Sequence, residues 1–493
     1  MDSPQSPGGD SPSEFQLAGW LVQPSLNRLV CDDREIHLEP KLMDVLVFLA
    51  ANAGRVVSKI EITDAVWPDV FITESVITRS IAGLRRAFGD DVKNPRFIET
   101  ISKRGYRLIA KIELPPTGND DRSAPRTPRS TTPRDTSTCA IPFVVGQWVR
   151  GDGFYGRATV LSEVLEGNRN WLWLLGTRRI GKTSVLKQLE HLALSSPELG
   201  FLPVFWDFQG ADLPEELHLD FAEALLDAEE LLDQAGVNVA EVSTGDCFES
   251  LNRLRRGLLA KGRRLLLLCD EVEELIQLHR KDPSILRKLR RALHSREGVR
   301  SVLASSTRLW QLAEPCEDTS PFLDGFTPPL PIGPLADDDA RQLIRQSQLP
   351  PASRPGFGDD DVERIRLHCG NHPYLVQVLC RRALDRGDLD QAIEDVAQDR
   401  AVGYFFAVDF ELLNDAERVL LRTLADRPGI TKTETCRQSG LADDAAARAF
   451  SALLQLGLVV QDTGGHYLIS NAFLRRWLTE GGEGSGNPPD QTV

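Results

Sequence analysis

Residues 176–183 have the types and the spacing that are needed to hold a phosphate chain. They read Gly-Thr-Arg-Arg-Ile-Gly-Lys-Thr and follow the apolar run 171–175 directly. Glycines let such a loop wrap a phosphate, backbone N–H groups supply positive potential, the lysine reaches the β- and γ-phosphates, and the hydroxyl ligates Mg²⁺. The sequence therefore predicts strand, loop and helix in that order, rather than a chance match in another glycine-rich turn. The expected nucleotide-binding residues of the loop are Gly176, Thr177, Arg178, Arg179, Ile180, Gly181, Lys182, Thr183 and Ser184.

A second apolar run, 265–269, ends at an acidic pair, Asp270 and Glu271. A buried strand that ends there delivers one carboxylate to the Mg²⁺ and a second to the attacking water. Alone, four leucines and an acidic pair are more often a core strand that reaches solvent, so the interpretation depends on the phosphate loop upstream. We expect Asp270 to join Thr183 as a metal ligand and Glu271 to be the catalytic residue.

A third apolar run begins at Ser301 and is followed by polar residues. Ligands of an open α/β sheet bind at the carboxyl ends of its strands. Ser306 and Thr307 are therefore the expected sensors of the γ-phosphate, whereas Arg308 is interpreted as a structural ion-pair partner.

A local basic surface lies near the start of the chain. In the helix expected from Thr73 to about Phe88, Ile77, Ile81 and Leu84 share one face, and the opposite face is basic and small. Between positions 79 and 107 the sequence has eight basic and three acidic residues, within a chain of net charge −15. Such a concentration of positive charge is typical of a DNA-binding surface, and a solvated basic face used for protein contacts is the alternative.

Block 14–113 resembles the OmpR/PhoB-type winged-helix DNA-binding domain. The resemblance depends on Leu38-Glu39-Pro40-Lys41, Gly54 to Ser58, Trp67, Leu84 to Asp90 and Ile98 to Leu108. It implies that the third helix enters the major groove of double-stranded DNA and that a wing enters the minor groove. The implied base-reading residues are Ser75, Thr78 and Arg79, and the implied phosphate contacts are Arg85, Arg86, Lys103 and Arg104.

Residues from roughly 150 to 480 resemble STAND-type and archaeal AAA-like ATPases. Beyond the phosphate loop, the resemblance depends on Phe154-Tyr155-Gly156-Arg157, Pro334-Leu335 and Gly370 to Leu375. It implies that Gly156 and Arg157 lie at the adenine end of an ATP or ADP molecule, and that a C-terminal winged helix clamps the ADP-bound state. No arginine finger can be assigned, and His372 is open between a site residue and a packing residue.

These elements predict a multidomain α/β plus α+β protein. We expect disordered ends at 1–13 and 481–493, an N-terminal winged helix at 14–113, and a flexible linker at 114–142, where Pro, Thr, Ser, Arg and Asp dominate. A parallel-sheet P-loop NTPase core at 143–335, a helical lid at 336–403 and a C-terminal winged helix at 404–480 follow. The third helix of that last domain contains one basic residue, Arg448, so we do not expect it to bind DNA.

The leading hypothesis is an ATP-binding, sequence-specific transcription regulator whose nucleotide state controls oligomerisation and DNA binding, with slow ATP hydrolysis as a switch. An ATPase motor recruited to DNA and a nucleotide-binding scaffold are the alternatives. The eight cysteines lack zinc-ligand spacing, and no apolar stretch is long enough for a membrane span. We therefore expect a cytoplasmic protein without a membrane partner; the signal or protein that acts upstream is not indicated.

Overall fold

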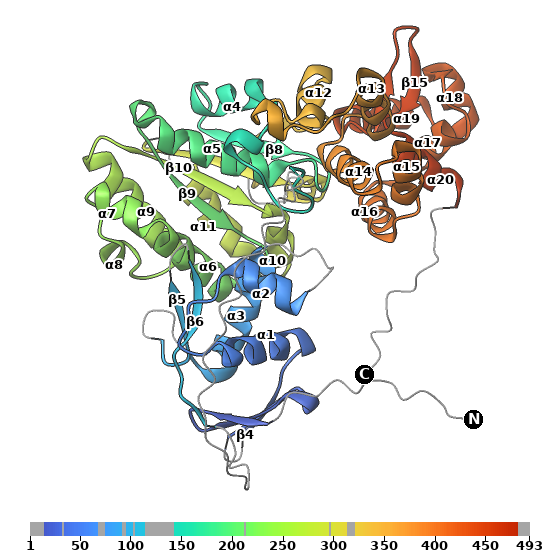
Figure 1. The fold of residues 1–493 in the computed structure, drawn as a ribbon. Helices are drawn as coiled ribbons and strands as arrows, with labels where there is room; N and C mark the ends of the chain where they lie inside the picture. The colour runs from blue at the N-terminus through green and yellow to red at the C-terminus, as the bar shows by residue number, and fades with distance from the viewer. Residues whose placement is uncertain are drawn as a thin grey trace, which may run out of the picture. The chain divides into compact units, whose positions relative to one another are not determined.

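The computed structural model describes residues 14–31, 34–67, 74–90, 95–101, 104–113, 142–211, 213–294, 297–312 and 321–481 (Figure 1). The chain divides into two compact units, Met1–Ser137 and Thr138–Val493. The division falls inside the expected linker, whose residues 114–141 lie outside the described part, as do 1–13 and 482–493. No described helix has both the length and the apolar character that crossing a bilayer requires.

The first unit is an antiparallel sheet, a group of three helices and a hairpin around one apolar core. The sheet has the strand order β4-β3-β2-β1-β7, and the core includes Leu46, Ile81 and Tyr106. The described elements are β1 (Phe15–Leu17), β2 (Trp20–Gln23), β3 (Arg28–Cys31), β4 (Arg34–His37), α1 (Pro40–Ala51), α2 (Lys59–Val66), α3 (Glu74–Phe88), β5 (Ile98–Ile101), β6 (Gly105–Leu108) and β7 (Ile112–Glu113).

Local sequence explains where these helices begin. Pro40 occupies the first turn of α1, where a missing N–H costs nothing. Ser58 and Glu61 form a complete capping box at the start of α2. Both starts are those expected from the sequence.

The second unit contains a five-stranded parallel sheet with the order β12-β8-β11-β10-β9. Its elements, with the helices that cover it, are α4 (Ala158–Leu165), β8 (Trp171–Leu175), α5 (Lys182–Ser195), β9 (Phe201–Asp207), α6 (Pro214–Asp227), α7 (Glu229–Gln234), α8 (Val239–Val242), α9 (Cys247–Ala260), β10 (Arg264–Asp270), α10 (Leu275–Lys281), α11 (Pro283–Leu293), β11 (Val299–Ser305) and β12 (Leu330–Pro331).

Both faces of this sheet are buried, which explains why its strands are continuous apolar runs. Along β10, Leu265 and Leu267 pack in the core beneath α6, α9 and α11. Leu266 and Leu268 point to the other face, into the core beneath α4 and α5. Figure 1 shows these two helical layers on either side of the sheet.

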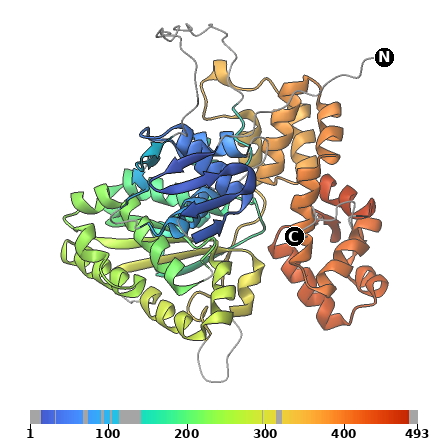
Figure 2. The same ribbon diagram turned by 90° about the horizontal axis from the view of Figure 1, so that it is seen from below.

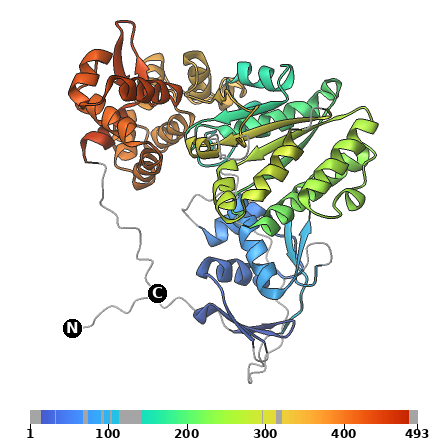
Figure 3. The ribbon, with the colours of Figure 1, turned by 180° about the vertical axis from the view of Figure 1, so that it is seen from behind.

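A helical region follows the sheet, and its helices α12–α15 lie side by side (Figure 2). A smaller sheet of order β13-β15-β14 lies near the end of the chain, and the hairpin β14–β15 projects from the surrounding helices (Figure 3). The elements are α12 (Asp337–Arg345), α13 (Asp359–Cys369), α14 (Pro373–Arg386), α15 (Leu389–Ala397), α16 (Arg400–Glu411), α17 (Asp415–Asp426), β13 (Ile430–Thr431), α18 (Lys432–Ser439), α19 (Asp443–Gln455), β14 (Val459–Gln461), β15 (His466–Ile469) and α20 (Ala472–Thr479).

The division expected between 403 and 404 does not separate two cores. Helix α16 runs through that position without a break. A single apolar core joins Leu343, Leu379 and Phe410 with Leu453 and Phe473. The helices before α16 and the C-terminal block therefore pack as one body, because α16 contributes side chains to the core that they share.

Candidate nucleotide site and DNA-binding surface

The first unit presents part of the expected basic surface on α3 and on the β5–β6 hairpin. Arg86 is exposed in the last turn of α3, and Arg104 is exposed at the turn of the hairpin. Thr78 is half-buried, and its hydroxyl lies 3.3 Å from the phenol oxygen of Tyr106 on β6. This contact joins helix to hairpin, so Thr78 connects the two elements that we expected to dock on DNA.

Arg85 corrects one expectation. Its guanidinium is buried, and it donates hydrogen bonds to the Ile98 carbonyl at 3.0 Å and to the Thr100 hydroxyl at 2.7 Å. A buried group cannot reach a DNA phosphate. Arg85 therefore fixes β5 against α3, because the last turn of α3 directs it toward that strand and away from solvent.

For three other expected DNA contacts the structure gives no side-chain position. Ser75 and Arg79 lie on α3, but their side chains are not among those described, and Lys103 lies outside the described residues. Arg107, which contributed to the basic count, forms an ion pair with Glu99 at 2.6 Å.

In the second unit, the phosphate loop adopts backbone conformations that residues with a side chain rarely adopt. Gly181 has φ +101° and Arg179 has φ +56°, values in the left-handed region. A Cβ at Gly176 would lie 2.6 Å from the Ile332 carbonyl oxygen. The loop is thus held tightly between β8 and the chain just after β12.

Lys182 and the first turn of α5 complete the loop. The Lys182 ammonium is buried and donates to the carbonyls of Gly176 and Thr177 at 3.2 and 3.0 Å. Ser184 faces away from the loop, since its hydroxyl accepts a hydrogen bond from the Val149 amide at 3.1 Å. It therefore secures the upstream segment to α5.

The two expected metal ligands meet. The Thr183 side chain, in the first turn of α5, lies near the Asp270 carboxylate at the end of β10 and lowers its pKa. The two residues come together although β11 separates β8, which precedes the phosphate loop, from β10. Burial raises the pKa of Asp270, and the carboxylate of Asp207, its partner in the parallel register, raises it further. Such crowding of negative charge is relieved by a cation. Asp207 was not found from the sequence; its signal is an acidic residue at the end of the apolar strand β9.

Glu271 follows directly in a left-handed backbone conformation, φ +50°. Burial, with the nearby carboxylates of Glu273 and Asp270, raises the pKa of its side chain. Strained non-glycine backbone and a shifted carboxyl pKa concentrate at functional sites. The structure thus brings the expected catalytic carboxyl to the same sheet edge as Asp270 and adds Glu273, which the sequence analysis did not select.

Ser306 lies beside the start of the phosphate loop, since the Gly176 amide donates to the Ser305 carbonyl at 3.3 Å. The Ser306 amide donates to Glu273 at 3.1 Å, and its buried hydroxyl has no protein hydrogen-bond partner among the described residues. Thr307 begins a short 3-10 helix and is half-buried. The side chain of Arg308 is not described.

Arg157 joins the loop to the end of the sheet. Its half-buried guanidinium donates to the carbonyls of Pro334 at 3.1 Å and Ile180 at 3.3 Å, and removal from water lowers its pKa to about 10. At Gly156, φ is +76°, and an added Cβ would lie 2.5 Å from the Asp339 carboxylate of α12. The two residues thus connect loop, sheet and α12.

Helices after the sheet also contact the phosphate loop. The Asp409 carboxylate of α16 accepts a hydrogen bond from the Arg178 amide at 3.2 Å. The Arg179 guanidinium lies 4.4 Å from the ring centre of Tyr374 and 6.0 Å from that of Phe405. Asp409 was missed because nothing in its sequence context marks it.

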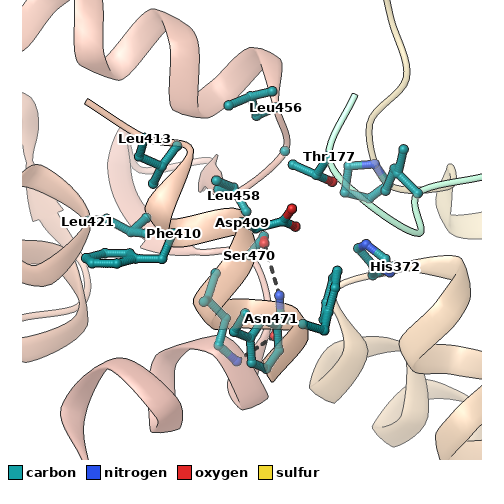
Figure 4. A pocket seen from close by; sticks show the side chains of 16 residues that line it. Thr177, His372, Asp409, Phe410, Leu413, Leu421, Leu456, Leu458, Ser470 and Asn471 are labelled. Carbon is teal, nitrogen blue, oxygen red and sulfur yellow. Dashed lines mark hydrogen bonds between the residues drawn. The ribbon is translucent and has the colours of Figure 1, made fainter. Parts of the chain in front are cut away.

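A small cavity of about 20 Å³, room for roughly one water molecule, lies at this junction. In Figure 4 the Asp409 side chain points toward the segment of the phosphate loop that carries Thr177, and His372 lies nearby. His372 is buried, and neither ring nitrogen has a hydrogen-bond partner among the described residues. Burial, with the nearby Arg157 and Arg179, lowers its pKa to about 3. A neutral imidazole with unused donor and acceptor positions is suited to a polar ligand.

The residues present fit a nucleoside polyphosphate with Mg²⁺. A loop too tight for side chains at Gly176, a buried ammonium, and the hydroxyl–carboxylate pair of Thr183 and Asp270 are the donor set that such a ligand uses. The unpartnered Ser306 hydroxyl and the Glu273 carboxylate oxygen are buried polar atoms at the same edge.

Residues 33–108 match the family model described as "Transcriptional regulatory protein, C terminal". The transcriptional activator CadC of Escherichia coli is 43% identical over 98 residues, which are 20% of this chain and 19% of CadC. The cholera toxin transcriptional activator of Vibrio cholerae is 35% identical over 107 residues, 20% of this chain and 36% of that protein. The transcriptional regulatory protein KdpE of Mycobacterium tuberculosis is 36% identical over 97 residues, 20% of this chain and 43% of that protein. The chain thus spans less than half of each of these relatives.

The solved structures that are similar to parts of the chain include a DNA-binding domain and an ATPase. The DNA-binding domain of Escherichia coli CadC covers 21% of this chain and 98% of that domain, with 37% identity and a TM-score of 0.20. A Walker-type ATPase of Pyrococcus abyssi covers 69% of this chain and 99% of that protein, with 16% identity and a TM-score of 0.49. The second unit is ATPase-like by its own parallel sheet and phosphate loop. The first unit of this chain belongs to the OmpR/PhoB-type winged-helix family of transcriptional regulatory proteins.

Proposed function

We propose that this protein is a transcription regulator that binds specific DNA sequences through its winged helix and is controlled by ATP and ADP. The observation that carries the proposal is the tight phosphate loop with its buried Lys182 ammonium and with Thr183 near Asp270. The same chain contains a winged-helix domain of the transcriptional regulatory protein family. Neither unit alone would suggest nucleotide-controlled DNA binding.

In this proposal the loop amides and Lys182 bind the phosphates, while Thr183 and Asp270 hold Mg²⁺. The metal ion neutralises phosphate charge when it is bound. Ser306 and Thr307 respond to the γ-phosphate, and Glu271 orients the attacking water. Hydrolysis is proposed to be slow and to act as a switch. Burial, with the carboxylates of Glu273 and Asp270, raises the pKa of Glu271 in the absence of a bound cation.

The contact between Asp409 and the Arg178 amide connects the nucleotide to the C-terminal block. Phosphate charge in the loop repels an ionised Asp409, so a nucleotide with more phosphates disfavours the docking of α16. Helices α17, α18 and α19 with the hairpin β14–β15 are interpreted as a C-terminal winged helix. Its release, as in STAND-type ATPases, exposes surface for self-association and pairs DNA-binding units on repeated half-sites.

The test is a DNA-binding selection with the full chain, run with ADP and with a non-hydrolysable ATP analogue, on wild type and Lys182→Ala. We expect site-specific binding that is tighter with the ATP analogue, together with an increase in molar mass, and loss of both differences in Lys182→Ala. Equal affinity and equal mass in all four conditions would contradict nucleotide control.

Two other results would replace the proposal. Fast ATP turnover that DNA stimulates and that Glu271→Gln abolishes identifies a motor recruited to DNA. Nucleotide binding without any sequence-selective footprint identifies a scaffold.

A further inference from the structure

The outer helices of the ATPase-like core separate charge by sign. Residues 253–264 contain six Lys or Arg and no carboxylate, and residues 279–291 contain six Lys or Arg and one carboxylate, Asp282. The adjacent helices α6 and α7, residues 214–234, contain eight carboxylates and no Lys or Arg. In a chain of net charge −15, residues 253–264 and 279–291 therefore form a local basic surface, and the acidic helices α6 and α7 border it.

The positive groups point outward together. Helices α9 and α11 are neighbours above the same face of the sheet (Figure 1). The apolar side of α11, with Ile285 and Leu289, is buried in the core. Six exposed side chains form what we call the basic face: Arg253, Arg256, Arg280, Arg287, Lys288 and Arg291.

Most of the basic face is not neutralised by the protein. Arg253 forms an ion pair with Glu249 at 3.1 Å. Arg290, at the rim, forms one with Asp324 at 2.8 Å. Within the part of the chain that the structure describes, Arg287, Lys288 and Arg291 form no ion pair shorter than 4 Å. The Asp282 side chain accepts a hydrogen bond from the Ser284 amide, which caps α11.

We propose that the basic face binds the phosphate backbone of DNA beside the site held by the winged helix. The inference rests on the proposed function, because it requires the winged helix to hold a duplex. Arginine forks match phosphate geometry, and each neutralised phosphate releases a counterion. Since the two units are one chain, DNA bound to the first is at a high effective concentration for the second.

A second copy of this chain is the competing occupant, because the carboxylates of α6 and α7 offer an acidic surface. DNA is favoured because the tethered duplex is present whenever the winged helix is bound, whereas a second copy must associate from bulk solution.

The experiment measures the affinity of the full chain for two duplexes that carry the selected site, one trimmed to the site and one with flanking DNA. The variant is Arg287→Ala/Arg291→Ala. The matched control is Arg437→Ala/Arg448→Ala, which removes two exposed arginines from α18 and α19 and therefore changes the charge by the same amount.

On the flanked duplex we expect the Arg287/Arg291 variant to lower the slope of log affinity against log salt by about 2, one for each lost phosphate contact. On the trimmed duplex both variants should match wild type.

An unchanged slope on flanked DNA, or an equal loss in the control, would overturn the inference while wild-type binding keeps the proposed function intact. A lower molar mass of the variant without DNA, with an unchanged slope, would assign the face to a second copy. Failure of wild type to bind either duplex would instead reject the proposed function.

Discussion

At the residue scale, burial separates two neighbouring arginines that the sequence presents as equivalent. Arg85 donates to the Ile98 carbonyl and to Thr100, whereas Arg86 is exposed. We expect Arg85→Ala to destabilise the first unit by about 2–3 kcal/mol, because charge-assisted bonds are lost and a buried carbonyl is left without its donor. Native-state hydrogen exchange of peptides from 15–113 measures this loss.

Arg86→Ala is the matched control. It should change stability by less than about 0.5 kcal/mol and lower the salt dependence of DNA binding by about one phosphate contact. If Arg85→Ala left exchange unchanged and weakened DNA binding instead, the phosphate role expected from the sequence would be restored.

Asp409 gives the docking of α16 a pH dependence. Burial raises the pKa of its carboxyl from 3.8 to about 6, while the Arg178 amide, Lys182, Arg178 and Arg179 oppose the shift. The neighbouring His372, with a pKa of about 3, stays neutral in this range. A raised carboxyl pKa contributes stability below about pH 4 that is lost as pH rises through about 6.

We therefore expect hydrogen exchange in α16 to become faster between about pH 5 and 7 after correction for the intrinsic exchange rate. Asp409→Asn should remove this change, and Asp385→Asn, at an exposed position of α14, should keep it. An equal pH response in all three proteins would show that Asp409 does not control docking.

At the element scale, two glycines with the same backbone conformation differ in their surroundings. Gly370 ends α13 at φ +54°, and an added Cβ would collide with the Ser470 carbonyl oxygen of the C-terminal block. Gly440 ends α18 at φ +67° with nothing within 4 Å. We expect Gly440→Ala to cost about 1 kcal/mol and Gly370→Ala about 2–4 kcal/mol, because only the second adds a steric collision.

Urea unfolding of the second unit measures this difference. Equal losses for the two variants would mean that the contact of Gly370 with the C-terminal block does not hold the helices together.

At the scale of the whole molecule, the two compact units predict two unfolding transitions. ATP analogue and Mg²⁺ at about 100 times Kd should stabilise the second unit by about 2.7 kcal/mol and leave the first unit unchanged. Differential scanning calorimetry of wild type and Lys182→Ala measures this, with no nucleotide shift expected in the variant. A nucleotide shift of both transitions would show that the units are coupled even without DNA.

The sequence by itself determined the winged helix, the phosphate loop and the acidic strand end, because each depends on local rules. Glycine spacing, alternating strands, capping residues and helical periodicity act over a few residues and can be recognised in the chain. The boundaries of α1, α2 and β10 follow from such rules.

Only the tertiary structure decided which side chains meet. Thr183 lies near Asp270 because parallel strands place their carboxyl ends at one edge of the sheet. Asp409 reaches Arg178 from a helix more than two hundred residues away. The same holds for Arg85, whose exposure depends on the strand packed beside its helix. These outcomes depend on long-range packing, in which burial changes the free energy of a charged group by far more than local sequence can indicate.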